Sequence, residues 1–227
     1  HPLRLQLNDR AAGTYAHSIL VAEMAGRAAE ALDRDVLLAR LGGVYHDIGK
    51  IGNPGMFIEN IKNPERNSPH LKMAPQESAS VIIAHVTEGV KLGEKYNLPR
   101  DIIHIIEQHH GDTPVRYFLD KARRELPPGG ELDESVFHYP CPVPQTTEAA
   151  LVMLADSISS AIIGLGAGAT EDLKTLTVTR ILRESEESGQ FDECCFSPSE
   201  RRKAVSIFLD VMGAKNYERV KNFPHGK

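Results

Sequence analysis

The sequence predicts an all-α fold, a bundle of helices interrupted by long loops. Apolar residues recur at helical spacing through most of the 227 residues. No alternation of apolar and polar residues lasts long enough to support a β-sheet, and segments rich in Pro, Gly and Asn separate the helical stretches. Nothing in the composition marks a linker or an internal repeat, so we expect residues 1–227 to form one domain with a substantial core.

The first half of the chain is expected to contain three helices and one long loop. His17 lies in the first turn of the first helix, and His46-Asp47 follows the second helix, where the apolar period breaks. A long irregular loop inside a compact domain is usually functional. The expected segments are a helix from Tyr15 to Leu32, a helix from Asp35 to Tyr45, a loop from Ile51 to Pro75, and a helix that starts near Gln76 and carries His85.

The second half is expected to contain four further helices and a second loop. Neighbouring helical residues point about 100° apart, so His109 and His110 can reach one site only near a helix end, which Gly111 supplies. The expected segments are a helix from Pro99 to His110, a loop from Glu125 to Gln145, a helix that begins at Thr146 and carries Asp156, a helix from Ala169 to about Glu187, and a last helix opened by the capping box Ser197-Pro198-Ser199-Glu200.

The longest apolar stretch, residues 149–169, is expected to be a buried helix rather than a membrane span. It contains Asp156 and three serines, which do not suit the interior of a bilayer. The chain begins with His1-Pro2-Leu3-Arg4, which lacks the basic and apolar regions of a signal peptide. We therefore expect no direct membrane contact from these residues.

Side chains able to bind a metal recur in one order along the first two thirds of the chain. They are enough to hold two divalent cations, and the carboxylate of Asp47 is able to bridge them. This pattern predicts a binuclear metallohydrolase. The series is His17, His46, Asp47, His85, His109, His110 and Asp156.

A single histidine on a helix is more often an ordinary polar residue than a metal ligand, and some histidines here fit that interpretation. The His46-Asp47 pair differs because an apolar helical run delivers it to a break that contains glycine. A buried carboxylate without a partner is very costly, and a metal ion is a suitable partner. The histidines interpreted as ordinary are His104, His1, His70, His138 and His225.

Imidazole and carboxylate ligands favour Mn or Fe and are compatible with Zn. Cys141, Cys194 and Cys195 lie away from the seven positions, which argues against a thiolate site, and they form no disulfide framework, which favours a reducing compartment. Two cations polarise a phosphoryl oxygen, lower the pKa of a bridging water and stabilise the leaving oxygen. Hydrolysis of a phosphodiester uses all three effects.

The formal net charge of −5 argues against a nucleic-acid polymer as the main partner, because proteins that bind polyanions present basic surfaces. A small anionic substrate, held by metals and a few Lys or Arg side chains, fits this charge. No pattern in the sequence specifies an oligomeric state.

Short sequence words surround the seven positions. They are Gly13-Thr14-Tyr15-Ala16-His17-Ser18, Tyr45-His46-Asp47-Ile48-Gly49-Lys50, Phe57-Ile58-Glu59-Asn60, Ile106-Glu107-Gln108-His109-His110-Gly111, Pro144-Gln145-Thr146-Thr147-Glu148 and Met153-Leu154-Ala155-Asp156-Ser157. With the order of the metal-capable residues, they resemble the HD-domain phosphohydrolase superfamily. The resemblance is closer to the cytosolic catalytic domain of the PgpH-type seven-transmembrane HD-domain proteins, a family of cyclic-di-AMP phosphodiesterases, and it extends from His1 to the region of Tyr217.

The resemblance implies how the ligands divide between two cations. One cation would be bound by His17, His46, Asp47 and Asp156, and the other by Asp47, His85, His109 and His110. Lys50 would lie near a phosphate of the substrate. In the family this domain follows a membrane bundle, so the chain would be a cytoplasmic domain of an integral protein of the bacterial inner membrane.

The implied reaction is hydrolysis of cyclic-di-AMP to linear pApA by attack of a hydroxide that bridges the two metals, with Asp47 and Lys50 in catalytic positions. A second possibility is another HD-domain phosphohydrolase, either a cyclic-di-GMP phosphodiesterase or a mononuclear nucleotidase. A mononuclear nucleotidase would leave His85, His109 and His110 without a role. The cyclic-di-GMP branch usually has a Gly-Tyr-Pro word after its histidine pair, whereas residues 111–114 here read Gly-Asp-Thr-Pro. A third possibility is a non-catalytic nucleotide sensor. An incomplete set of metal-binding residues would favour it, but the set in this sequence is complete.

The loop from Asn53 to Pro75 and the Pro-rich segment from Tyr139 to Gln145 are expected to form the walls of the substrate cleft. Asn60 and Gln145 are candidates for contact with a base or ribose, because a side-chain amide can match the donors and acceptors of adenine. Amides in loops also commonly cap turns, which is the simpler interpretation.

Overall fold

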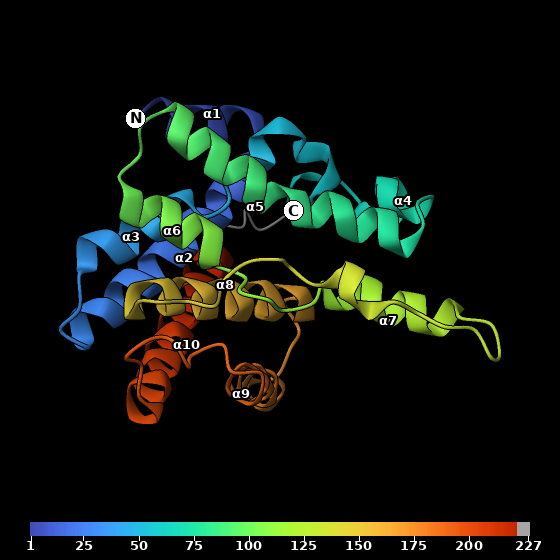
Figure 1. Ribbon diagram of the computed structural model, residues 1–227. Coiled ribbons are helices and arrows are strands. Elements are labelled where there is room, and N and C mark those ends of the chain that lie inside the picture. Colours follow the sequence, from blue (N-terminus) through green and yellow to red (C-terminus); the bar gives the residue numbers. More distant parts are fainter. Residues whose placement is uncertain (222–227) are drawn as a thin grey trace, which may run out of the picture.

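The computed structural model describes the backbone of residues 1–221 and the side chains of residues 1–213, and helices fill most of this length (Figure 1). Within these residues no strand forms, and the one extended pairing is an isolated bridge between Pro114 and His138. The all-α prediction is confirmed. The α-helices are α1 (Pro2–Arg10), α2 (Ala12–Ala31), α3 (Val36–Tyr45), α4 (Pro64–Asn67), α5 (Pro75–Lys95), α6 (Arg100–Gln108), α7 (Arg116–Glu125), α8 (Thr147–Leu165), α9 (Glu171–Glu187) and α10 (Pro198–Lys221).

Several helices begin where the sequence signals place their start. The Asp35 carboxylate accepts a hydrogen bond of 2.9 Å from an N–H in the first turn of α3. The Thr146 hydroxyl accepts one of 3.1 Å from the first turn of α8. Before α10, the backbone N–H of Ser197 donates to the Glu200 carboxylate at 2.8 Å, as a capping box requires. Local side-chain chemistry therefore sets these boundaries.

Besides α4, a single turn inside the expected first loop, two helices lie where the sequence predicted none. α1 buries Leu3 and Leu7, and α7 buries Phe118, Leu119 and Ala122. They are only 9 and 10 residues long, so each shows barely two repeats of the apolar pattern. Short helices of this kind depend on tertiary packing for their stability.

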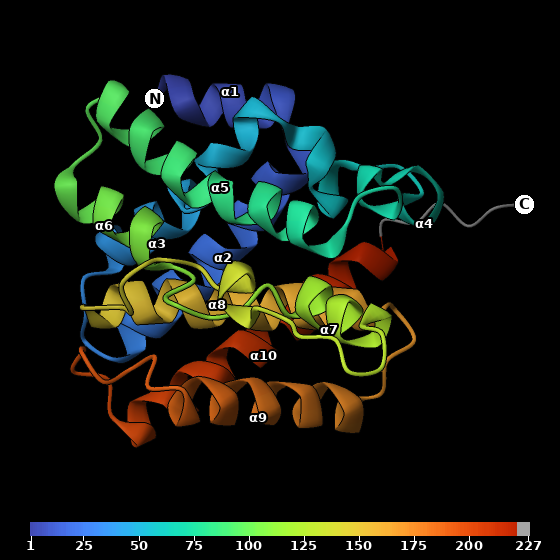
Figure 2. The same cartoon turned by 45° about the vertical axis from the view of Figure 1, so that its right-hand side comes forward.

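α8 runs through the middle of the bundle, as the two views show (Figures 1 and 2). It packs against α2, α3 and α6 on one side and against α9 and α10 on the other. α5 packs on α6 and α7, and α7 with its following loop extends away from the bundle (Figure 1). The central helix is thus in contact with most of the elements around it.

α8 is also the one helix in the described part of the chain that is long and apolar enough to cross a membrane by length and composition. In the structure, 61% of its most apolar window is buried, and Leu151, Val152 and Leu154 are fully or almost fully covered. The expectation of a buried helix in this stretch is confirmed.

The apolar core is divided into clusters. The largest joins α2, α8 and α10, a second joins α1, α6 and the 3-10 helix η1 (Ile48–Gly52), and a third joins α5, α7 and the 3-10 helix η5 (Glu134–Phe137). Tyr45 and Ile48, which flank the His46-Asp47 pair, belong to the second cluster, whereas Ala155, next to Asp156, belongs to the largest. The polar residues therefore lie between two apolar cores.

The first long loop is irregular, as predicted, and is built from single helical turns. Phe57 anchors it, with its side chain 5% exposed. Besides α4, its turns are the 3-10 helices η2 (Pro54–Met56), η3 (Ile58–Asn60) and η4 (Pro69–Leu71).

Candidate metal centre

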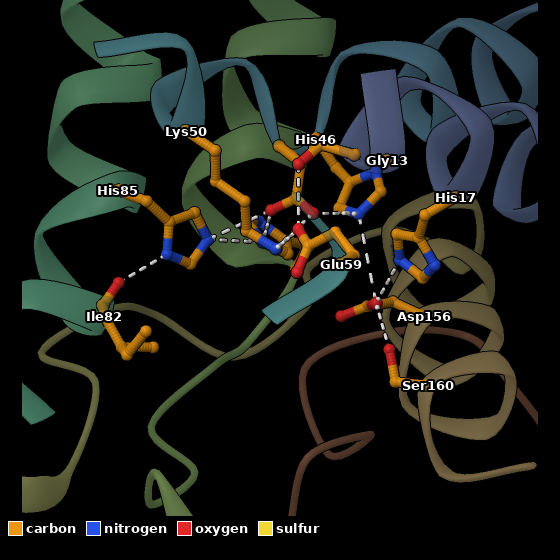
Figure 3. Close-up of polar contacts among 12 residues, drawn as sticks. Gly13, His17, His46, Lys50, Glu59, Ile82, His85, Asp156 and Ser160 are labelled. Carbon is orange, nitrogen blue, oxygen red and sulfur yellow. Dashed lines mark hydrogen bonds and ion pairs between the residues drawn. The ribbon is translucent and has the colours of Figure 1, made fainter. Parts of the chain in front are cut away.

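The seven metal-capable side chains come from α2, α3, α5, α6 and α8 and from the start of η1, and His17, His46, His85 and Asp156 are directed toward a common centre (Figure 3). Six of the seven form two groups, and within each group the ligand atoms all lie within 4.8 Å of one another. The first group is His17, His46 and Asp156, and the second is His85, His109 and His110. Two such clusters are consistent with a binuclear metal site.

Asp47 lies between the two groups. Its Oδ2 is 3.2 Å from Nε2 of His46, and its Oδ1 is 3.3 Å from Nε2 of His85. The carboxylate is buried, with the residue 1% exposed. Each of its oxygens therefore faces a different group, which is the geometry of a bridging ligand.

Two glycines permit the backbone paths that bring these ligands together. A Cβ on Gly49 would overlap the backbone carbonyl of His85, so only glycine lets η1 approach α5 this closely. Gly111 has a φ of +54°, the left-handed conformation that commonly follows the end of a helix. It ends the helical path directly after the adjacent histidines.

The tautomers of three imidazoles are set by the backbone. Nδ1 of His46, His85 and His109 lies 2.8, 2.6 and 2.7 Å from the carbonyl oxygen three residues earlier. A carbonyl can only accept, so each Nδ1 donates, and in the neutral imidazole the Nε2 atom then keeps its lone pair. These Nε2 atoms are directed at one another and at Asp47, as unprotonated ligand atoms would be.

The atoms at the centre lack partners that the protein itself can supply. Nε2 of His85 and Nε2 of His109 lie 3.2 Å apart, although neither carries a hydrogen to share. Nε2 of His46 and Oδ1 of Asp47 are buried and have no hydrogen bond among the described residues. Buried acceptors without donors are costly, and divalent cations would satisfy all of these atoms. The donor set therefore fits a metal centre.

Asp156 completes the first group. Its Oδ1 lies 2.8 Å from Nε2 of His17 and accepts a hydrogen bond of 3.3 Å from the Ser160 hydroxyl (Figure 3). The same oxygen is 3.9 Å from Nε2 of His46. α8 supplies this carboxylate, and His46 follows the end of α3. Two elements that are far apart in the sequence therefore contribute to the first group.

Burial and neighbouring charges together shift the pKa values of several of the metal-capable residues. Burial lowers the pKa of His110 to about 3 and is the largest cause that holds the pKa of His109 well below its usual range. Burial alone would raise the pKa values of Asp47 and Asp156. Lys50 and His46 outweigh this effect at Asp47, and His17 outweighs it at Asp156, so both pKa values are lowered. His109 and His110 are thus neutral and face the ionised carboxylates of Asp47 and Asp156, the states that bind metals.

Lys50 places a fixed positive charge beside Asp47. Its Nζ lies 2.7 Å from Oδ2 of Asp47 and 3.1 Å from Oε1 of Glu59, which in turn accepts a hydrogen bond of 2.8 Å from Thr14 (Figure 3). Burial lowers the pKa of Lys50, but attraction to the two carboxylates outweighs it and raises that pKa. The ammonium group therefore stays charged.

A cleft of about 580 Å³ opens beside the first group. This volume lies in the range of small-molecule sites. Polar side chains form one part of its wall and apolar side chains another. The first long loop contributes Ile58 and Glu59, as expected, whereas none of the described residues that line the cleft comes from the other expected wall, Tyr139 to Gln145. The lining residues of the cleft include His17, Lys50, Glu59, Ser160, Leu20, Ile58, Ile163 and Met212.

Asn60 is hydrogen-bonded to the start of α2. Its Oδ1 accepts from the backbone N–H groups of Gly13 and Thr14 at 3.0 and 3.2 Å, and its Nδ2 donates to the Thr14 hydroxyl at 2.8 Å. These bonds satisfy N–H groups that a helix start leaves free. The structure thus gives Asn60 a capping role, and its contact with a substrate stays a prediction.

Gln145 is paired with the buried side chain of Gln108. The backbone N–H of Gln145 donates to Oε1 of Gln108 at 3.0 Å, and Nε2 of Gln108 donates to Oε1 of Gln145 at 3.2 Å. Nε2 of Gln145 also lies 3.3 Å from the Glu193 carboxylate. This exchange ties the second long loop to the residue before His109, and a substrate contact by Gln145 likewise stays a prediction.

Two aromatic residues beside the ligands were not predicted from the sequence. The ring of Tyr139 stacks on His110 with centroids 4.2 Å apart, and the ring of Phe57 meets His85 edge-on at 5.9 Å. Lys50 Nζ lies over the Phe57 ring, 5.0 Å from its centroid. Both aromatics sit in the long loops, where no periodic pattern indicates the direction of a side chain.

The histidines interpreted as ordinary stand apart from both groups wherever the structure describes them. His104 is exposed on α6, and His1 accepts a hydrogen bond from the first turn of α1. His70 and His138 bond to the backbone carbonyls of Met56 and Asp112. His225 lies outside the described residues.

Comparison with known proteins is consistent with this geometry. The HD domain family model matches residues 14–161. The cyclic-di-AMP phosphodiesterase PgpH of Bacillus subtilis (strain 168) is 39% identical over 194 residues, covering 86% of this chain and 26% of the relative. The PgpH of Listeria monocytogenes (serotype 1/2a, strain 10403S) is 31% identical over 230 residues, covering 100% of this chain and 31% of the relative. The chain thus spans less than a third of the length of these curated relatives.

A solved structure of one relative has the same fold. The crystal structure of the HD domain of L. monocytogenes phosphodiesterase PgpH in complex with cyclic-di-AMP matches with a TM-score of 0.86 and 31% sequence identity. The match covers 95% of this chain and 98% of the PgpH HD domain. The chain belongs to the HD-domain family and is homologous to the HD domain of the PgpH phosphodiesterases.

Proposed function

We propose that this chain is a binuclear-metal phosphodiesterase that hydrolyses cyclic-di-AMP to linear pApA. The observation that carries the proposal is the pair of histidine-rich groups joined by Asp47, next to a cleft that Lys50 lines. The similar PgpH proteins are named cyclic-di-AMP phosphodiesterases, and a PgpH HD domain has been solved with that nucleotide. Both facts support this choice of substrate.

The ligands are assigned to two cations by the groups in which they lie. His17, His46, Asp47 and Asp156 would hold one cation, and Asp47, His85, His109 and His110 the other. The bridging position of Asp47 and the unpartnered Nε2 atom of His46 support this division. Because every ligand is an imidazole or a carboxylate, Mn or Fe is the proposed occupant, and Zn is compatible.

When bound, two such cations supply Lewis acidity for a phosphoryl oxygen and lower the pKa of a bound water. The chain's own residues position the substrate around them. Lys50 is proposed to contact a non-bridging phosphate oxygen, because its charge is fixed and its side chain lines the cleft. Asp47 keeps its carboxylate ionised and oriented for both groups, so that each depends on it.

The cleft walls are proposed to hold the bases and riboses. Leu20, Ile163 and Met212 give the cleft an apolar surface on which a base can lie, and Ser160 adds a hydroxyl. Asn60 and Gln145 remain the proposed amide contacts. Asn60 has one amide hydrogen beyond its bonds to α2, and Gln145 is exposed at the end of the second loop.

A substrate panel tests the function. The domain loaded with Mn²⁺ is incubated with cyclic-di-AMP, cyclic-di-GMP and deoxynucleoside monophosphates, and the products are separated by chromatography. Cyclic-di-AMP should be consumed fastest, and linear pApA should accumulate before any AMP. The Asp47→Ala variant, prepared in the same way, controls for contaminating enzymes. Faster cleavage of cyclic-di-GMP, or hydrolysis of monophosphates alone, would contradict the proposal.

We also infer that residues 1–227 act as one domain, the cytoplasmic part of an integral protein of the bacterial inner membrane. The small share of the PgpH relatives that this chain spans supports a larger parent protein. Fractionation of the full-length protein tests the location, because it should sediment with membranes and release this domain on proteolysis from the cytoplasmic side. Recovery of the full-length protein in the supernatant would contradict it.

A further inference from the structure

The orientation of His110 is not explained by the hydrogen bonds that orient its neighbours. Nδ1 of His46, His85 and His109 each donates to a carbonyl of its own helix, and His17 bonds to Asp156. Among the described residues, the His110 ring takes part in no hydrogen bond, and its Nδ1 lies 3.9 Å from the Asp156 carboxylate, beyond hydrogen-bond distance. Some other contact must hold this ring.

We propose that Tyr139 is the positioning residue for His110 and for the cation site of His85, His109 and His110, an inference that rests on the proposed binuclear function. The Tyr139 and His110 rings are stacked with centroids 4.2 Å apart and planes 20° from parallel. The same Tyr139 ring meets the His85 ring edge-on, with centroids 6.1 Å apart and planes at 85°. One aromatic ring thus contacts two of the three ligands.

The backbone of Tyr139 is attached to the turn that carries His110. Its N–H donates to the carbonyl of Thr113 at 3.0 Å, and the Thr113 hydroxyl donates to the carbonyl of His110 at 2.7 Å. These bonds accompany the bridge between Pro114 and His138. The extended pairing therefore holds the Tyr139 ring and the His110 ring in one unit.

The opposite end of this extended segment is anchored in the apolar core. Phe137, fully buried, packs with Phe118 and Leu119 of α7, while the intervening His138 is exposed. Phe137 ends the 3-10 helix η5, and its carbonyl accepts a hydrogen bond of 2.8 Å from the N–H of Val115. Burial of Phe137 thus fixes the start of the extended segment that carries Tyr139 to the ligands.

Stacking on Tyr139 restricts the orientation of the His110 ring in a way that a contact with a hydroxyl group would not. A planar ring restricts the imidazole to one plane, in place of the carbonyl hydrogen bond that the other ligands use. The aromatic face, rather than the hydroxyl, is the part that Tyr139 needs for this role.

Titration of the metal-free protein with Mn²⁺ tests the assignment, with free Mn²⁺ measured by electron paramagnetic resonance. Tyr139→Leu should weaken one of the two cation sites by about 10- to 100-fold, the usual effect of removing a group that orients a ligand, and leave the other near its wild-type affinity. Tyr139→Phe keeps the planar ring and should retain both affinities. Tyr139→Met has a longer, unbranched side chain of similar volume to leucine, also without a planar face, and should behave like Tyr139→Leu.

Tyr117→Leu is the matched control, because Tyr117 is 68% exposed on α7, and it should bind both cations normally. Wild-type affinities in Tyr139→Leu and Tyr139→Met would overturn the proposal. Equal losses in Tyr139→Phe and Tyr139→Leu would also overturn it, as would loss of both sites together in the Leu and Met variants. A wild-type protein that binds a single cation would instead contradict the proposed function.

Discussion

Lys50 Nζ lies 2.7 Å from Oδ2 of Asp47, and the same nitrogen lies 3.1 Å from Oε1 of Glu59. The lysine is therefore balanced by two carboxylates in the free protein. Because Asp47 belongs to the metal centre, a substrate phosphate would compete mainly with Glu59 for the ammonium group. Lys50 is thus the residue whose removal should separate substrate binding from metal binding.

The first prediction is that Lys50→Ala lowers kcat/KM for cyclic-di-AMP by about 100-fold, as removal of one group that stabilises a developing charge commonly does. The Mn²⁺ content should stay near that of the wild type, because Lys50 is not a ligand. Steady-state kinetics and elemental analysis of the same preparation measure both quantities. Lys91→Ala is the control, since Lys91 lies exposed on α5. Unchanged kinetics in Lys50→Ala would refute the phosphate contact.

The second prediction is that Asp47→Ala reduces the metal content of both sites and abolishes turnover. Each oxygen of this carboxylate faces a different group, so neither site retains its full ligand set. Mn²⁺ titration and elemental analysis measure the loss, and circular dichroism checks that the helices remain. Asp9→Ala, an exposed change on α1, should retain both cations. Retention of one tightly bound cation in Asp47→Ala would argue against a bridging role.

The third prediction concerns Asn60→Ala. This change removes the hydrogen bonds to Gly13 and Thr14 at the start of α2, and loss of a helix cap costs about 1–2 kcal/mol. For a domain of this size, each kcal/mol lowers Tm by roughly 2–4 °C. Differential scanning calorimetry measures the shift in the metal-free protein, with Asn8→Ala, an exposed change, as control. A normal Tm would refute the capping role, and a raised KM at saturating Mn²⁺ would support the substrate contact.

The fourth prediction is a pH dependence of stability. Hydrogen bonds from Ser197, followed by the Arg34 guanidinium, lower the pKa of Glu200 from 4.5 to about 2. A carboxyl group with a lowered pKa in the folded state adds stability above its unfolded pKa and loses it as the pH falls through the folded value. Glu200 should therefore stabilise the fold fully above pH 4.5 and progressively less down to about pH 2.

Thermal unfolding of the metal-free protein between pH 6 and pH 3 checks this dependence, where the chosen range is roughly that of carboxyl titration. The Tm difference between wild type and Glu200→Gln should shrink as the pH falls, because other carboxylates titrate equally in both proteins. Glu65→Gln, at an exposed position in the first loop, serves as the control. A Tm difference that stays constant with pH would contradict the lowered pKa.

The amino-acid sequence by itself determined the helical class, most of the helix starts and the identity of the metal-capable residues. These features depend on local signals, such as the Asp35 and Thr146 caps and the glycines after each ligand pair. The buried character of α8 was also predictable, because its apolar stretch contains Asp156. Such features need no knowledge of which segments meet in space.

Only the tertiary structure decided how these residues are used. Contacts between distant segments place Asp47 between the two groups, direct Asn60 to α2, and bring Tyr139 onto His110. α1 and α7 were likewise identified only from the structure, in which their few apolar residues pack against other elements. Loop side chains follow no repeating pattern, so their directions are set by long-range packing rather than by neighbours in the sequence.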